Sequence, residues 1–300
     1  MKKPLAGALL ALALLGLGSA PAEAAGPRPP APPAAPTAST TPAAPAASTA
    51  PAPAPAAAVD FAGTVALSNC SGSVVRLPQS RPDDRALVLS NGHCLESGMP
   101  GPGVVVVNRP STRSFSLLNA AGTRVATLRA GKIAYATMTD TDLALYELTS
   151  TYRQIEDRHR VRALELDTVR PAQGAGIAVV SGYWKRVYTC AVDGFAHRLQ
   201  EGDWTWKDSV RYTAACDTVG GTSGSPVIDT ATGKVVAVNN TGNESGGRCT
   251  VNNPCEVDAN GTVTVRRGIN YAQQTYTVAA CVGTGNAVDL GRPGCALPKP

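Results

Sequence analysis

The sequence predicts an all-β fold that consists of two β-barrels and ends in a helix. Short apolar and β-branched runs follow one another from residue 60 onward, and Asn, Gly, Pro and Ser separate them. Strands at this spacing are typical of barrels and sandwiches, and helical periodicity is scarce. The stretch from 60 to 285 is long enough for two barrels of about a hundred residues each.

Residues 59–168 are expected to form the N-terminal barrel, and residues 169–300 the C-terminal barrel with a helix and a tail. The strand candidates of the first are Thr64–Leu67, Ser73–Leu77, Ala86–Leu89, Val104–Val107, Arg124–Leu128 and Leu143–Leu148. Those of the second are Gly176–Val180, Arg186–Cys190, Val227–Ile228, Val235–Val238 and Thr262–Arg266. The best helix candidate is Tyr271–Cys281.

The segment before the barrels has two parts. Residues 1–24 resemble a secretory signal peptide, because a basic start and an apolar run precede small residues at the expected cleavage site. Residues 25–58 are almost wholly Pro, Ala, Thr and Ser, which favours an extended, disordered linker or pro-segment. We therefore expect a secreted protein, extracellular or periplasmic, without membrane insertion.

The charges and cysteines exclude several classes of function. The net charge is +5 at pH 7, but the basic residues are scattered, so we expect no nucleic-acid binding. Eight cysteines behind a signal peptide predict four disulfides, and no zinc-site spacing occurs, so we expect no metal. A single sequence does not determine the connectivity. We expect neighbours to pair, as Cys70–Cys94, Cys190–Cys216, Cys249–Cys255 and Cys281–Cys295.

The segment Gly220–Val227 predicts a nucleophilic serine, Ser223, on a tight turn. The glycines beside it allow left-handed backbone angles and a close approach of substrate to the main chain. Consecutive N–H groups there can point together at a developing oxyanion. Clusters of Gly, Ser and Thr also occur in ordinary loops, so the prediction depends on the residues that accompany the serine.

His93 and Asp142 are the candidates for base and acid. His93 stands between an apolar run that ends in glycine and Cys94, whose disulfide would fix the histidine where a strand ends. Asp142 opens the apolar run Leu143–Leu148, and a buried carboxylate needs a partner such as an imidazole N–H. Its alternative is a turn aspartate. The other histidines, at 159 and 197, lack such a setting and are interpreted as solvated.

The order of these residues separates the classes of serine hydrolase. An α/β-hydrolase has the order Ser, acid, His, and a subtilisin has the order acid, His, Ser. His93, Asp142 and Ser223 follow the order His, Asp, Ser in a β-rich chain. This is the chymotrypsin order, and it favours that architecture.

Three segments resemble the motifs of trypsin-like serine endopeptidases. Cys70–Val75 with Ser90–Cys94 resembles their "CSG … TAAHC" segment, Asp142–Leu145 resembles "D-I/L-A-L", and Gly221–Pro226 resembles "G-D-S-G-G-P". The Ser-Gly-Ser-Pro-Val variant after two glycines is most similar to the bacterial glutamyl-endopeptidase branch. The resemblance covers about residues 60–285 and implies two six-stranded antiparallel barrels of the chymotrypsin type.

The resemblance implies a monomeric serine endopeptidase that cleaves protein or peptide substrates through an acyl-enzyme, without a cofactor. Ser223 would attack the scissile carbonyl, His93 would transfer the proton to the leaving amine, and Asp142 would orient the imidazole. The N–H groups of Gly221 and Ser223 would form the oxyanion hole. Ser225 takes the family's second glycine place and is not the expected nucleophile.

The specificity of such an enzyme is open. Asp217 has the offset from Ser223 of the aspartate that binds Lys or Arg in trypsin-like enzymes, and its alternative is a turn residue. Thr218 fits the Ser/Thr wall of glutamyl endopeptidases, but Asn239 replaces their glutamate-binding histidine, which argues against glutamate specificity. Thr222 replaces the aspartate that receives the new N-terminal amine in animal enzymes, so that activation step is not expected.

Two other functions fit the same residues. A catalytically silent member of the fold would serve as a secreted binding module, and a secreted esterase would use the same three side chains. Covalent labelling at Ser223 separates a hydrolase from the silent module. Turnover of matched ester and peptide substrates separates the esterase from the peptidase.

Overall fold

The computed structural model describes residues 58–300. The expected signal peptide, residues 1–24, and residues 25–57 of the Pro/Ala-rich segment lie outside the described residues. None of the helices between 58 and 300 has the length and apolar composition that a membrane span requires.

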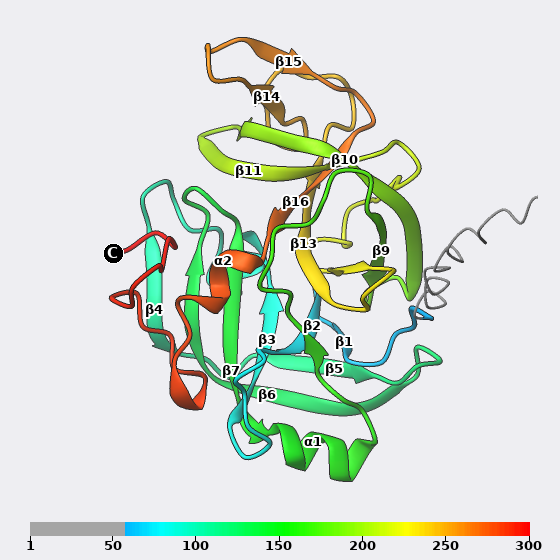
Figure 1. Cartoon of the computed structure of the whole chain (residues 1–300), viewed down its shortest axis with the longest axis vertical. Helices are drawn as coiled ribbons and strands as arrows, with labels where there is room; N and C mark the ends of the chain where they lie inside the picture. The colour runs from blue at the N-terminus through cyan, green and yellow to red at the C-terminus, as the bar shows by residue number, and fades with distance from the viewer. Residues whose placement is uncertain (1–57) are drawn as a thin grey trace, which may run out of the picture. The chain divides into compact units, whose positions relative to one another are not determined.

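The first sheet closes into an antiparallel barrel in the order β1-β5-β6-β7-β3-β2, with β2 pairing back to β1 (Figure 1). Its strands are β1 (Thr64–Ala66), β2 (Ser71–Arg76), β3 (Arg85–Ser90), β5 (Ser114–Leu118), β6 (Arg124–Thr137) and β7 (Leu143–Thr151). In addition, β4 (Val105–Pro110) pairs with β6, and β8 (Leu164–Glu165) runs parallel to β2.

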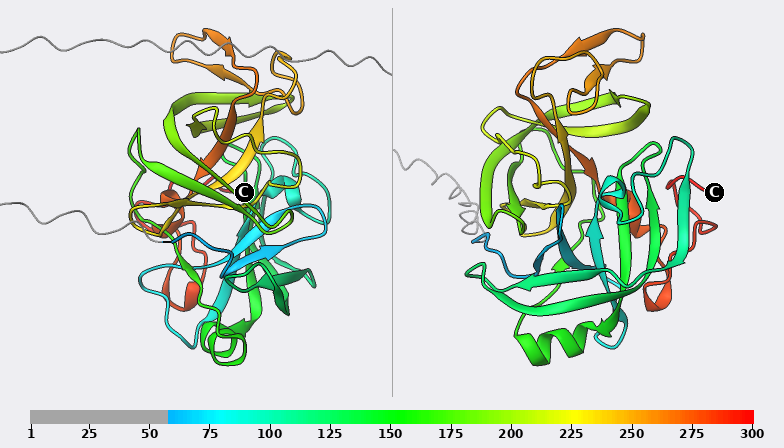
Figure 2. Two further views of the ribbon diagram at one scale, coloured as in Figure 1. Left: turned by 90° about the vertical axis from the view of Figure 1, so that its right-hand side faces the viewer. Right: turned by 180° about the vertical axis from the view of Figure 1, so that it is seen from behind.

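The second sheet closes in the order β11-β16-β13-β12-β9-β10, with β10 pairing back to β11. Its strands are β9 (Gly176–Ser181), β10 (Arg186–Glu201), β11 (Trp204–Tyr212), β12 (Pro226–Asp229), β13 (Val235–Gly242) and β16 (Asn270–Gln274). The hairpin of β14 (Cys255–Val257) and β15 (Val263–Val265) extends from β10, and Figure 2 shows it at the far end of the molecule. The predicted double barrel is therefore confirmed for residues 58–300, whereas the boundary at 168/169 stays a prediction.

The sequence of β3 is a continuous apolar run because both faces of this strand are buried. Successive side chains of a strand point to opposite faces. Val88 packs in the core of the first barrel, while Leu87 and Leu89 pack in a second cluster together with Val180 and Ile228 of the other sheet. Both faces of β3 are therefore buried, one inside its barrel and one between the barrels.

The C-terminal helix is shorter than the sequence predicts. The prediction Tyr271–Cys281 is wrong at its start, because Asn270–Gln274 form β16 and only α2 (Tyr276–Ala279) is helical. Ala272 of β16 pairs with both β11 and β13. The second barrel needs this strand to close, and the tertiary pairing overrides the local pattern.

One helix was not predicted. α1 (Tyr152–His159) follows β7 and begins with a capping box, in which Thr151 and Gln154 exchange side-chain to backbone hydrogen bonds. A Thr-x-x-Gln pattern is the sequence signal of such a start. The helix ends at His159, for which only a solvated position was expected.

All eight cysteines are disulfide-bonded, in the pairs obtained by joining neighbours: Cys70–Cys94, Cys190–Cys216, Cys249–Cys255 and Cys281–Cys295. The last of these ties the C-terminal tail to the segment after α2. The tail then runs back to the first sheet, where the Tyr135 hydroxyl donates to the carbonyl of Pro298 at 3.1 Å.

Candidate active site

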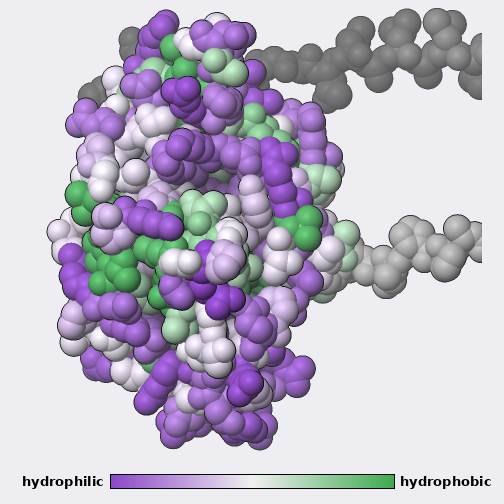
Figure 3. All heavy atoms as spheres, turned by 60° about the vertical axis from the view of Figure 1, so that its left-hand side comes forward, coloured by the Kyte–Doolittle hydropathy of each residue, from purple (hydrophilic) through white to green (hydrophobic). Residues whose placement is uncertain are grey.

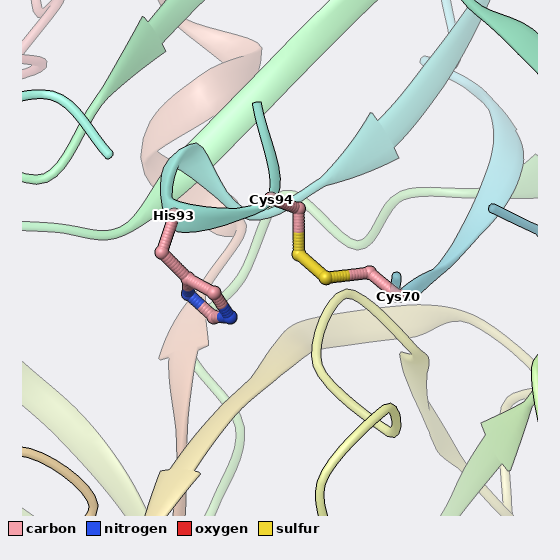
Figure 4. A group of neighbouring side chains, drawn as sticks. All are labelled: Cys70, His93 and Cys94. Carbon is pink, nitrogen blue, oxygen red and sulfur yellow. A yellow bond between two sulfur atoms is a disulfide. The ribbon is translucent and has the colours of Figure 1, made fainter. Parts of the chain in front are cut away.

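His93 lies in the short 3-10 turn η1 (Gly92–Cys94) that directly follows β3. Figure 4 shows the imidazole and the Cys70–Cys94 disulfide leaving this turn from adjacent residues. A side chain at Gly92 would place its Cβ 2.2 Å from the carbonyl oxygen of Thr137. Glycine is therefore required here because the turn packs directly against the end of β6.

The sulfur atoms of Cys70 and Cys94 lie close enough to the His93 ring to suggest a metal-ligand group. Both sulfurs belong to the disulfide, however, and a disulfide offers no thiolate to a metal. The group is better described as a histidine whose backbone is anchored by a disulfide.

Asp142, directly before β7, is fully buried and holds His93 at two points. Its Oδ2 lies 2.6 Å from His93 Nδ1, and its Oδ1 accepts from the backbone N–H of His93 at 3.0 Å. The Asn91 side chain also donates to the carbonyl of Asp142 at 2.8 Å. These contacts fix the imidazole relative to the carboxylate.

The environment of His93 raises its pKa. Burial alone would lower it, but the negative charge of Asp142, the hydrogen bond to Asp142 and the charge of Glu201 act in the opposite direction and outweigh burial. An Nδ1–H donated to Asp142 leaves Nε2 as the hydrogen-bond acceptor of the neutral ring. His93 is thus equipped to accept a proton at Nε2.

Ser223 lies in the loop before β12 and is held against the first sheet. Its carbonyl accepts from the N–H of Ser71 at 2.7 Å. The next residue, Gly224, has φ +81°, and a Cβ there would lie 2.1 Å from the Ser71 carbonyl oxygen. The glycine therefore permits the contact that brings the serine loop onto β2.

Ser223 and His93 line the same cleft. Within residues 58–300, no hydrogen bond joins their side chains, and the Ser223 hydroxyl donates to the carbonyl of Asn240 at 3.1 Å. The Ser223 hydroxyl is therefore bonded to the backbone of β13 and not to the imidazole.

The backbone around Gly221 leaves two N–H groups free near the serine. The N–H of Thr222 donates to the Val219 carbonyl at 3.0 Å, and Gly221 has φ +87°. In the described part of the chain, the N–H groups of Gly221 and Ser223 have no hydrogen-bond acceptor. The predicted oxyanion-hole donors are thus both available.

The predicted specificity residues lie in different places. Asp217 is exposed and lines a neighbouring cavity that does not include Ser223 or His93. Thr218 lines the main cleft, where its hydroxyl donates to Asn270 at 2.9 Å.

Asn239 also lines the cleft, but its side chain is buried and engaged with neighbours. Its amide accepts from the Tyr212 hydroxyl at 3.1 Å and donates to Thr222 Oγ1 at 3.2 Å. This side chain supports the loop that carries Ser223.

Several cleft residues were not predicted from the sequence. Glu201, at the end of β10, is only 7% exposed, and one carboxylate oxygen accepts from the N–H of Asn252 at 2.8 Å. Trp204 and Trp206 of β11 stand beside it in the cleft wall. These residues lack a local motif, and their place follows from the β10–β11 hairpin, which was not predicted.

Exposed apolar side chains gather at this site. In the view of Figure 3 the surface is largely polar, and apolar residues form patches within it. Of the large exposed apolar residues between 58 and 300, Met99, Val219 and Val251 line the cleft. Exposed apolar groups that cluster in this way mark a binding site.

Residues 70–238 match the family model described as the trypsin-like peptidase domain. No curated protein matches the chain. Solved structures that match the chain include the active form of the Rv3671c protease from M. tuberculosis, with 15% identity over 80% of this chain and 85% of that chain and a TM-score of 0.46. Another is the apo MamO protease domain from Magnetospirillum magneticum, with 14% identity over 71% and 92% and a TM-score of 0.43.

Proposed function

Since the chain belongs to the trypsin-like peptidase domain family, we propose that it is a serine endopeptidase that acts through Ser223, His93 and Asp142. The observation that carries the proposal is the buried Asp142 carboxylate bonded to His93 Nδ1, which leaves Nε2 free in the cleft that also contains Ser223. This arrangement supports proton transfer from the serine hydroxyl to the imidazole.

The proposed reaction has two halves. Ser223 Oγ attacks the scissile carbonyl carbon while His93 Nε2 takes its proton, and the N–H groups of Gly221 and Ser223 bind the oxyanion. The C–N bond then breaks, and the imidazolium gives its proton to the leaving amine. A water molecule repeats these steps on the acyl-enzyme, releases the carboxylate product and restores the serine hydroxyl.

The charges in the cleft argue against the glutamyl-endopeptidase branch. The lining includes Glu201 and Glu244, and no Lys or Arg of the described residues lines it. A glutamate side chain of a substrate would meet carboxylates and no permanent cation. We propose that the enzyme does not select acidic residues.

The disulfides support an exported protein. Four disulfides tie together the described part of the chain, and such bonds persist in oxidising compartments. We propose an extracellular or periplasmic location, and we propose that residues 1–24 direct the export.

A fluorophosphonate probe tests the proposed function, because it phosphonylates only an activated serine. We expect labelling of the folded, disulfide-bonded protein, loss of labelling in Ser223→Ala, and full labelling in the control Ser225→Ala. Ser225 is buried two residues away, and its hydroxyl has no hydrogen bond within residues 58–300. Failure of the folded protein to label would favour the silent binding module.

A further inference from the structure

The turn between β9 and β10 contacts the loop that carries Ser223. Its two aromatic residues, Tyr183 and Trp184, are 40% and 52% exposed, and their rings pack edge to face at 4.9 Å. A Cβ on Gly221 would lie 2.9 Å from the Tyr183 ring and 3.1 Å from Trp184 Nε1. The aromatic pair therefore lies directly against Gly221, in the space that any other residue there would fill.

Trp184 makes one directed contact with this loop. Its indole N–H donates to the carbonyl of Gly220 at 2.7 Å. The peptide between Gly220 and Gly221 is trans, so its C=O and N–H point in opposite directions. The bond that holds the Gly220 carbonyl toward the indole therefore holds the Gly221 N–H away from it.

The peptide between Gly221 and Thr222 is also held by a hydrogen bond, from Ser71 of β2. The Ser71 hydroxyl donates to the carbonyl of Gly221 at 3.3 Å and accepts from the N–H of Tyr183 at 3.1 Å. The Ser181 hydroxyl lies 3.1 Å from it and accepts from the N–H of Trp184 at 3.2 Å. The turn, β2 and the serine loop thus share one hydrogen-bond network.

The peptide between Gly220 and Gly221 needs the hydrogen bond from Trp184, because both of these residues are glycine. Glycine adopts many backbone angles at little steric cost, so the intervening peptide can rotate unless another group fixes it. In the described part of the chain, Trp184 Nε1 is the side-chain donor to the Gly220 carbonyl. A reversed peptide would place a carbonyl where the oxyanion hole requires a donor.

We propose that Trp184 is a positioning residue for the oxyanion hole, with its indole N–H fixing the orientation of the Gly221 N–H. The inference rests on the proposed peptidase function. No sequence motif indicates a role for this exposed tryptophan. Trp184 does not line the cleft that holds Ser223 and His93.

The test replaces Trp184 with Phe, which keeps an aromatic ring but removes the donor, and with His. Histidine can restore the donor, because its Nε2 lies two bonds from Cγ in the five-membered ring, as Nε1 of tryptophan does. We expect kcat of Trp184→Phe to fall at least about tenfold with KM within about twofold, up to the roughly 10²–10³-fold loss that follows removal of one oxyanion donor. Trp184→His should retain more of the kcat than Trp184→Phe.

The matched control is Tyr183→Phe, because the Tyr183 hydroxyl makes no hydrogen bond within residues 58–300 and the ring is kept. It should leave kcat unchanged. Affinity for a peptide aldehyde, whose hemiacetal oxygen occupies the oxyanion hole, should fall in Trp184→Phe by the same factor as kcat. A kcat for Trp184→Phe within twofold of the wild type, or equal kcat values for the Phe and His variants, would overturn the proposal.

Crystal structures of the wild type and of Trp184→Phe give a readout that does not depend on activity. We expect the Gly220 carbonyl to point toward position 184 in the wild type and to be reversed or in two orientations in the variant. An unchanged Gly220 peptide in the variant overturns the positioning role. If the wild type hydrolyses no substrate, the peptidase proposal fails, and the two crystal structures still decide the role of Trp184.

Discussion

Asp142 has one task in the proposed mechanism, which is to hold the imidazole of His93. Its carboxylate accepts from both Nδ1 and the backbone N–H of that residue. In Asp142→Asn an amide replaces one acceptor oxygen with a donor and favours the wrong tautomer of the ring. We expect kcat to fall by about 10⁴-fold while the fold is kept. A loss below tenfold, measured on a peptide or ester substrate, would remove Asp142 from the mechanism.

Glu201 acts on the same histidine through its charge. The imidazole must be neutral to accept a proton, and its pKa is raised above the ordinary 6.5 by Asp142 and, to a smaller extent, by Glu201. Activity should therefore rise with pH through an inflection above 6.5. In Glu201→Gln one of the charges that favour the imidazolium is gone, so the inflection of kcat/KM should move to lower pH.

The control for this pH profile is Glu96→Gln. Glu96 is an exposed carboxylate three residues from His93 in sequence, and it is not among the charges that shift the pKa of His93. Its substitution should leave the inflection in place. A shift of the Glu201→Gln inflection to higher pH would contradict the electrostatic account.

At the scale of residues, local motifs predicted part of the site. His93, Asp142 and Ser223 each stand in a recognisable setting, and the structure places His93 in contact with Asp142 and in one cleft with Ser223. Glu201 and Trp184 have no such setting. Their relation to the site depends on pairing between β9, β10 and β11, which brings distant segments together.

At the scale of elements, the start of α1 has a local sequence signal, the capping box of Thr151 and Gln154. The side chain of Thr151 accepts from the N–H of Gln154 and so satisfies one of the free donors at the start of the helix. Thr151→Ala should lower the free energy of unfolding by about 1 kcal/mol, measured by urea denaturation. Because no residue of α1 lines the cleft, kcat should be unchanged. An equal loss of unfolding free energy in Thr149→Ala would argue against a capping role.

For β16, in contrast, the local sequence pattern predicted a helix where the structure has a strand. Its residues have a helical period, yet Ala272 and Tyr271 pair with strands on both sides. The strand is specified by the two neighbours that it joins and not by its own composition. Barrel closure of this kind cannot be read from a short window of sequence.

At the scale of the whole molecule, the disulfides differ in the loops that they close. Cys70–Cys94 spans 24 residues and Cys249–Cys255 spans 6. In the chain-entropy model the longer loop stabilises by about 3 kcal/mol, roughly 1 kcal/mol more than the shorter one. We expect Cys70→Ser/Cys94→Ser to unfold at lower urea concentration than Cys249→Ser/Cys255→Ser. The opposite order would show that contacts near the cysteines outweigh loop closure.

The proposed active site exists only because the two barrels pack together. His93 and Asp142 come from the first sheet and Ser223 from the second, and the N–H of Ser71 holds the carbonyl of Ser223 across the boundary. The most direct test of this account is cleavage of a diverse peptide library by the mature protein, with Ser223→Ala and Ser225→Ala alongside.

We predict cleavage by the wild type and by Ser225→Ala, no cleavage by Ser223→Ala, and no preference for acidic residues before the scissile bond. No cleavage by a folded, disulfide-bonded wild type, or cleavage that persists in Ser223→Ala, would contradict the account.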